Sequence, residues 1–177
     1  AVMCGSEFGV LLEDQIADGL NAKLGTTHLK SSGMPSLDSK VDKHLQANAI
    51  RAAGLAAVKE KLAFTEDDVR AFLEENKGTD ISVVVKPQRG SGSVGVMFCD
   101  SEQAVWDAYQ TILAGEHKSH CGDKYRHYSF AGVLIQEYLV GSEYIVNSVL
   151  SNGVMKTTAM FKYDKRPYNG APFVCFS

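Results

Sequence analysis

The 177-residue sequence has no long hydrophobic run, little net charge and no cluster of metal-binding residues. Its apolar segments fall well short of the ~20 residues that a membrane-spanning helix needs, so no contact with a membrane is expected. The net charge of −3 gives no reason to expect nucleic-acid binding. The five histidines are scattered without the spacing of metal ligands.

The four cysteines are also widely spaced and form no C-x-x-C pair. With a hydrophobic content of 45%, the chain has the composition of a globular protein. Such a chain does not depend on disulfides, so the cysteines are expected to be thiols in a reducing compartment, which indicates the cytoplasm. No Ser/His/Asp or Cys/His arrangement suggests a side-chain nucleophile. The four positions are Cys4, Cys99, Cys121 and Cys175.

Both ends of the chain suggest a piece of a larger protein. The sequence starts without methionine inside an apolar segment, and it stops within the apolar residues 173–177. We therefore expect part of any functional site to be missing and the isolated piece to be inactive.

A glycine-rich stretch follows the β-branched run at residues 83–85 and Lys86. A second apolar run follows it, so the stretch is predicted to join two antiparallel strands. Glycine can adopt positive φ and lets backbone N–H groups approach a ligand closely. Together with the charges of Lys86 and Arg89, these amides suit a flap over polyphosphate; an ordinary glycine-rich hairpin turn is the alternative. The glycines are Gly90, Gly92 and Gly95.

Two better-known glycine loops do not fit this stretch. The spacing G-x-G-x-x-G indicates a dinucleotide-binding turn only where the glycines open a helix, and residues 94–99 have the pattern of a strand. In a protein kinase the lysine follows the loop, and the H-R-D and D-F-G motifs are required. Here Lys86 precedes the loop, and neither motif is present.

The rest of the chain alternates between helical and strand patterns. Residues 1–4, 5–9 and 10–24 are predicted as strand, turn and helix, which is half of an α/β unit. Residues 116–130 are predicted as an insertion or loop, and Asn152-Gly153 as a hairpin turn. The fold class is therefore α+β with a largely antiparallel sheet, after the tail of an α/β domain. The other predicted helices start near Asp42, Thr65 and Ser101 and end near Gly54, Lys77 and Leu113, and the other strands cover residues 81–86, 94–99, 132–139, 143–150 and 154–163.

Three features in this order resemble the ATP-grasp superfamily of carboxylate–amine ligases. Asp42-Lys43 opens a helix, Lys86 precedes the glycine-rich flap, and residues 136–143 (QEYLVGSE) follow a buried strand. The resemblance covers residues 42–163. Residues 5–10 (GSEFGV) and 163–170 (YDKRPYNG) look closest to the amino-acid and dipeptide ligase branch.

The resemblance implies an ATP-grasp fold and two domains. Residues 1–38 would be the end of an N-terminal α/β domain, called the pre-ATP-grasp domain, with its linker. Residues 39–177 would be an ATP-grasp domain that is incomplete at its C-terminus.

The resemblance also implies an ATP site. Lys43 and Lys86 would contact the phosphates, Glu143 would accept hydrogen bonds from the ribose, and the flap would cover the β- and γ-phosphates. The backbone of residues 136–139 would lie beside adenine, with the N–H of Leu139 as a donor. The flap residues are Arg89, Gly90, Ser91, Gly92 and Ser93, and the hinge residues are Gln136, Glu137, Tyr138 and Leu139.

Simpler roles remain open for three of these residues. Lys43 fits a solvated helix position, Glu137 fits a solvent-facing strand position, and Glu143 fits an ion pair with a nearby lysine. No catalytic side chain is assigned. ATP and Mg²⁺ are the expected cofactors, and the magnesium ligands are expected beyond Ser177, because Asn147 and Asp164 do not match their place in the family.

The implied function is an ATP-dependent ligase. ATP would convert a carboxylate to an acylphosphate, and an amine would then displace phosphate, which leaves an amide, ADP and phosphate. The expected partners are small carboxylates and amines, amino acids among them. The alternatives are a biotin carboxylase-like or purine-pathway ATP-grasp enzyme, and a non-catalytic regulatory ATP-binding module.

Overall fold

The computed structural model describes residues 2–5, 9–32, 38–78, 80–90, 93–115, 132–168 and 171–176. The loop predicted at residues 116–130 and most of the turn predicted at residues 5–9 lie outside them. The chain divides into two compact units, the first ending at Tyr138 and the second starting at Leu139. No helix among the described residues has the length and apolar composition that crossing a membrane requires.

The first unit begins with helix α1, Val10–Leu24, which has the predicted bounds. Gly25 follows it with φ of 62°, the left-handed conformation in which glycine commonly ends helices. Ala17 is buried, whereas Leu24 at the end of the helix is 67% exposed. The strand predicted at residues 1–4 is wrong for described residues 2–5, because no strand of the described sheets pairs with them.

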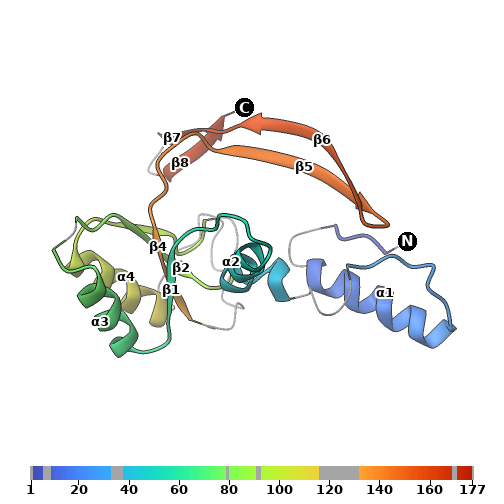
Figure 1. The fold of residues 1–177 in the computed structure, drawn as a ribbon, viewed down its shortest axis with the longest axis horizontal. Helices are drawn as coiled ribbons and strands as arrows, with labels where there is room; N and C mark the ends of the chain where they lie inside the picture. Colours follow the sequence, from blue (N-terminus) through green and yellow to red (C-terminus); the bar gives the residue numbers. More distant parts are fainter. Residues whose placement is uncertain are drawn as a thin grey trace. The chain divides into compact units, whose positions relative to one another are not determined.

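A four-stranded sheet forms the centre of the first unit (Figure 1). Its strands lie in the order β1-β4-β2-β3, and all three neighbouring pairs are antiparallel. The glycine-rich stretch therefore joins two antiparallel strands, β2 and β3, as predicted. The strands are β1 (Glu60–Ala63), β2 (Val83–Pro87), β3 (Met97–Cys99) and β4 (Val133–Glu137).

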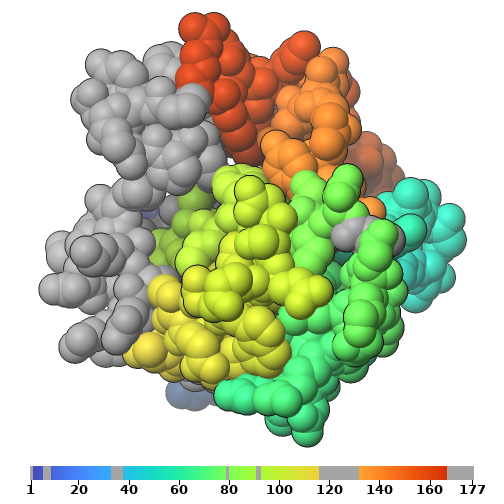
Figure 2. All heavy atoms as spheres, turned by 90° about the vertical axis from the view of Figure 1, so that its left-hand side faces the viewer, coloured from blue at the N-terminus to red at the C-terminus, as the bar shows by residue number. Residues whose placement is uncertain are grey.

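Helices cover this sheet from two sides. In Figure 1, α3 (Glu66–Glu75) and α4 (Glu102–Leu113) lie on one side, and α2 (Lys43–Ala52) lies on the other. Figure 2 shows the outer surfaces of α3 (green) and α4 (yellow) next to each other. Each helix starts at a predicted cap, because the side chains of Asp42, Thr65 and Ser101 accept hydrogen bonds from backbone N–H groups of the first turn.

The hydrophobic core lies between the sheet and helices α3 and α4. Alternate strand residues point into it, as the period of two along a strand requires. Each fully buried valine or isoleucine of this kind contributes roughly 1.5–3 kcal/mol to stability. The core residues include Ala63, Val69, Val83, Val85, Cys99, Val105, Tyr109, Ile112, Val133 and Ile135.

The second unit consists of two antiparallel hairpins. Strands β5 (Tyr144–Ser151) and β6 (Val154–Lys162) are joined at Asn152 and Gly153, whose φ angles of 50° and 77° confirm the predicted hairpin turn. Strands β7 (Asp164–Tyr168) and β8 (Ala171–Phe176) form the other hairpin, which the sequence did not predict as strands.

Candidate nucleotide-binding site

The central sheet has a second face, opposite the core, that carries charged and polar side chains. Glu60 pairs with Gln136, and Gln136 pairs with Val84, so these three residues point to the same side. Lys86 lies two residues beyond Val84 on the same strand and shares that side. Because Val83 and Val85 point into the core, this polar face is the one that Glu60, Gln136 and Lys86 share.

Lys86 is half-buried on this polar face. Burial lowers the pKa of its ammonium group, and the charge of the Glu60 carboxylate acts in the opposite direction and raises it. A partly desolvated cation beside a glycine-rich connection is suited to bind an anion, because an anion replaces the water that burial removed.

Asp42 joins the start of α2 to the chain that leaves β2. Its Oδ1 accepts hydrogen bonds from the N–H groups of His44 and Leu45, at 3.1 and 3.0 Å. Its Oδ2 accepts from Gln88 Nε2 at 2.6 Å and from Arg89 Nε at 3.3 Å. The Asp42 side chain is thus both a helix cap and the anchor of the segment that leads into the flap.

The hydrogen bonds of Asp42 make the stability of the fold sensitive to acid. Burial raises the pKa of Asp42, but hydrogen bonds from Leu45, Gln88 and Arg89 outweigh it and hold the pKa below its ordinary value. A carboxyl whose pKa is lower in the folded state stabilises the fold above about pH 4, and this contribution is lost as the pH falls toward the folded-state pKa.

We expect the urea-unfolding free energy to fall between pH 5 and pH 3 in the wild type and to fall less in Asp42→Asn. The variant should be less stable at pH 7, because the amide is a weaker acceptor than the carboxylate. Its stability should also depend less on pH, because the amide cannot be protonated in this range. Unfolding curves at pH 3, 4, 5 and 7 measure both slopes. Equal slopes in the two proteins would contradict the role of Asp42 as an ionised anchor.

Two predicted phosphate-binding cations bond to protein groups. Lys43 Nζ donates to the carbonyl of Gly90 at 2.7 Å, at the start of the flap. Arg89 is 3.3 Å from both Asp38 and Asp42. The simpler expectation that Lys43 is only a solvated helix residue is therefore wrong, because its side chain ties α2 to the flap.

The described part of the flap has the backbone that the glycines suggest. Gly90 and Gly95 have φ of 144° and 69°, and Ser93 has φ of 61°. Positive φ in this region is uncommon for a residue other than glycine. Ser91 and Gly92, the other two predicted flap residues, lie outside the described residues.

The predicted adenine hinge continues from β4. Gln136 points to the polar face, while the backbone N–H of Glu137 donates to the carbonyl of Lys59 and its Oε1 accepts from the N–H of Lys59, at 2.7 Å. The Glu137 side chain is partly exposed and also holds the chain entering β1 through this hydrogen bond. Tyr138 packs edge-to-face on Phe98 with 5.5 Å between ring centroids, and Leu139 is 64% exposed.

Glu143, the predicted ribose contact, belongs to the second unit. Its carboxylate pairs with Lys165 at 2.6 Å, and its carbonyl accepts from the N–H of Tyr163 at 2.9 Å. The ion pair that the sequence left open as the simpler role therefore forms. A ribose contact by Glu143 stays a prediction.

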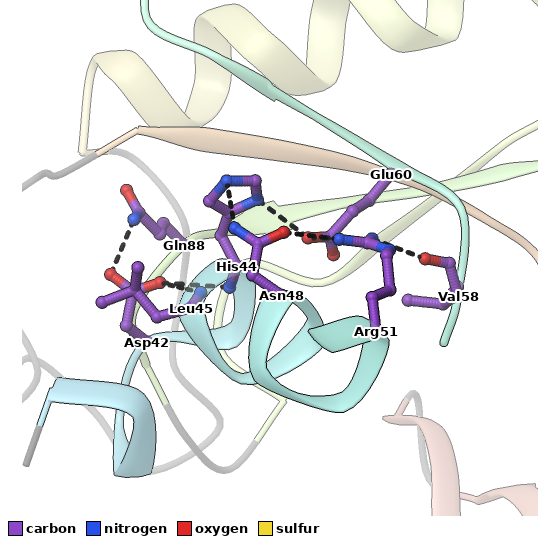
Figure 3. Close-up of polar contacts among 8 residues, drawn as sticks. All are labelled: Asp42, His44, Leu45, Asn48, Arg51, Val58, Glu60 and Gln88. Atoms are coloured by element: carbon purple, nitrogen blue, oxygen red, sulfur yellow. Dashed lines mark hydrogen bonds and ion pairs between the residues drawn. The ribbon is translucent and has the colours of Figure 1, made fainter. Parts of the chain in front are cut away.

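The polar face also contains a network around the buried Glu60 carboxylate that the sequence did not predict (Figure 3). His44 Nδ1 lies 2.8 Å from Glu60 Oε1, and Arg51 Nη2 lies 3.6 Å from the same oxygen. Asn48 lies between His44 and Arg51 and bonds to both. The available signal was the alternation in β1, where Glu60 and Leu62 must share the face opposite Ala63.

The described residues contain no group of three or more His, Cys, Asp or Glu side chains arranged to hold a metal ion. We therefore assign no magnesium ligand. Of the four cysteines, the described Cys4 and Cys99 are thiols. Burial raises the pKa of Cys99 to about 11, which makes it an unreactive core residue.

A four-stranded antiparallel sheet, a glycine-rich strand connection and a half-buried lysine before it define a nucleotide-binding α+β domain. The ATP-grasp domain family matches residues 79–172. This match covers more than half of the 177 residues, and the chain belongs to the ATP-grasp family. The α+β, ATP-grasp fold class predicted from the sequence is confirmed.

Relatives with known names support the same family. The chain is 28% identical over 172 residues to dapdiamide A synthase of Enterobacter agglomerans. The aligned region covers 97% of this chain and 37% of that protein. The fold resembles that of an L-amino acid ligase from Bacillus licheniformis, with TM-score 0.63, 14% identity, and coverage of 99% of this chain and 36% of that one. It also resembles D-alanyl-alanine synthetase A from Vibrio cholerae, with TM-score 0.60, 14% identity, and coverage of 87% and 42%.

Proposed function

We propose that this chain is the ATP-binding part of an ATP-dependent carboxylate–amine ligase. In this reaction the carboxylate takes the γ-phosphoryl group of ATP and becomes an acylphosphate. An amine then attacks the acyl carbon and displaces phosphate, so that the products are an amide, ADP and phosphate. The observation that carries the proposal is the half-buried Lys86 on the polar face, directly before the glycine-rich connection.

A domain division goes with this proposal. Residues 1–38 would be the end of the preceding α/β domain with its linker, and residues 39–177 would form the incomplete ATP-grasp domain. The chain spans 37% of the length of the curated relative that it matches. The complete reaction is therefore proposed for the whole protein.

The chain's own residues would bind and orient ATP. Lys86 would neutralise charge that develops on the transferred phosphoryl group. Lys43, which already donates a hydrogen bond to the carbonyl of Gly90, would contact the phosphates together with the flap. The flap amides at residues 89–93 would exclude water from the acylphosphate. The backbone of residues 136–139 would hold adenine, and Glu143 would hold the ribose.

Magnesium would accompany the nucleotide and would neutralise phosphate charge, with one or two carboxylates as its protein ligands. The described residues contain no such group of ligands, so no step of the reaction is assigned to a magnesium-binding residue here.

The substrates would be amino acids. Dapdiamide A synthase, the L-amino acid ligase and D-alanyl-alanine synthetase are named for products or substrates of this class. Among ATP-grasp enzymes, this favours an amino-acid ligase over a biotin carboxylase-like enzyme.

The test is product analysis with the whole protein of which this chain is a part, Mg-ATP and pooled amino acids. We expect ADP and phosphate to form together with a new compound whose mass is that of two amino acids minus water. The Lys86→Met variant run in parallel should form both products about 100-fold more slowly. ADP without a condensed product would indicate another acid or amine, and nucleotide binding without turnover on any pool would support a regulatory module and contradict the ligase.

A further inference from the structure

We infer that Glu60 is a positioning residue for Lys86, and that its buried carboxylate keeps the lysine ammonium charged and directed over the polar face of the sheet. This inference rests on the proposed function of Lys86. Glu60 would not touch the nucleotide and would act only through Lys86.

The register of the sheet brings the two side chains to one face. Glu60 lies on β1 and Lys86 on β2, with β4 between them. Neighbouring strands are about 4.8 Å apart, and Lys86 lies two residues, about 7 Å, along β2 from Val84, the residue that faces Glu60 across β4. The two backbones are therefore separated by about 12 Å. Glutamate and lysine have long side chains, and together they span such a gap.

The hydrogen bonds of Glu60 leave one of its oxygens without a partner. His44 and Arg51 both approach Oε1. Oε2 is buried and has no hydrogen-bond partner among the described residues. A buried carboxylate oxygen without a partner is costly. The Lys86 ammonium is a cation on the same face of the sheet, although it does not hydrogen-bond to Oε2 in this structure.

The hydrogen bonds of the network determine which nitrogen of His44 carries its proton. The guanidinium of Arg51 can only donate, so the atom of Asn48 at 2.6 Å from it is the amide oxygen. The amide nitrogen of Asn48 then donates to His44 Nε2 at 3.0 Å. His44 must therefore carry its proton on Nδ1 and donate it to Glu60 as a neutral imidazole (Figure 3).

A neutral His44 leaves the negative charge of Glu60 largely in place. Arg51 is the one cation among the network's side chains, and its Nη2 lies 3.6 Å from Glu60 Oε1. Glu60 Oε2 has no hydrogen-bond partner among the described residues. The charged groups around Glu60 are thus Arg51 of α2 and Lys86 of β2. The upward effect of Glu60 on the pKa of Lys86 agrees with this geometry.

The experiment measures the protonation of Lys86 directly, in the full chain without nucleotide. Competitive labelling with acetic anhydride from pH 7 to 11, followed by mass spectrometry of the peptide that contains Lys86, gives its titration curve. In Glu60→Gln the pKa of Lys86 should fall, so that labelling below that pKa becomes about threefold to tenfold faster. In Arg51→Gln the field of Glu60 is less compensated, so labelling should become slower.

Glu75→Gln is the matched control, because Glu75 pairs with Lys61 on the other side of the sheet; it should leave the labelling of Lys86 unchanged. General destabilisation would accelerate labelling in both network variants, whereas the inference requires opposite changes. Unchanged labelling in Glu60→Gln, or changes of the same sign, would overturn it. If Glu60→Gln does not fold, Arg51→Gln, whose side chain is 39% exposed, decides alone.

Calorimetric binding of Mg-ADP separates this inference from the proposed function. Glu60→Gln should bind ADP with near wild-type affinity at pH 7 and several-fold more weakly by pH 9.5, because Lys86 loses its proton earlier. If labelling changes as expected but Lys86→Met binds ADP like the wild type, the Glu60–Lys86 coupling stands and the nucleotide role of Lys86 is wrong.

Discussion

Replacing Lys86 with methionine is expected to lower kcat/KM of the full chain about 100-fold, the loss typical when one charge-stabilising group is removed from an active site. Affinity for Mg-ATP should fall at least about tenfold, because a charge-assisted contact to phosphate is lost. Methionine keeps most of the aliphatic stem of lysine and removes only the charge. Since burial already disfavours that charge, the unfolding free energy should change by less than about 1 kcal/mol.

Lys61→Met is the matched control for this measurement. Lys61 also lies on a strand of the central sheet, but it points to the opposite face and pairs with Glu75 at 3.6 Å. Steady-state kinetics and calorimetric ATP titrations of both variants should show a loss only at Lys86. Equal nucleotide affinity in Lys86→Met and the wild type would remove Lys86 from the site.

Replacing Asp42 with alanine should have the largest effect on stability, a loss of about 3 kcal/mol. The helix cap accounts for about 1 kcal/mol. The bonds from Gln88 and Arg89 are charge-assisted, and removing their shared acceptor leaves a buried amide unpaired, which costs about 2 kcal/mol more. Gln88 is 7% exposed, so water does not replace the lost partner.

Ser101→Ala is the control that separates the contribution of a helix cap from that of the Gln88 and Arg89 bonds to Asp42. Ser101 caps α4 through one hydrogen bond to the N–H of Ala104, at 3.3 Å, and it is exposed. Its loss should cost about 1 kcal/mol. Urea unfolding at pH 7 measures both variants, and an Asp42→Ala loss no larger than that of Ser101→Ala would show that Asp42 is only a cap.

The sequence predicted best those parts of the fold that local signals determine. The bounds of α1, the caps at Asp42, Thr65 and Ser101, and the turn at Asn152 and Gly153 each depend on a few adjacent residues. The β7–β8 hairpin was missed because residues 164–168 are mostly polar and form a strand only through pairing with 171–176. The failed strand is the converse case, an apolar run that no described strand pairs with at residues 2–4.

The site was predicted as a set of residues but not as a set of contacts. Lys86 and the glycines have a local signature, whereas the Asp42–Gln88 bond joins residues 46 positions apart. The Glu60–His44 contact spans 16 positions. Alternation along β1 indicates the face of Glu60 but not the helix residue that it meets. Arg89, predicted for phosphate, is engaged with Asp38 and Asp42, because partner choice depends on the folded geometry.

The division of the central sheet into two faces has a consequence for which of its residues can be replaced. In β2, Val83 and Val85 serve the core, while Val84 and Lys86 serve the opposite face. Substitutions at Val83 or Val85 are therefore expected to disturb the core, whereas a substitution at Lys86 is expected to alter the opposite face. The side chain proposed to meet the reactants can thus be changed with little effect on the packing between the sheet and its helices.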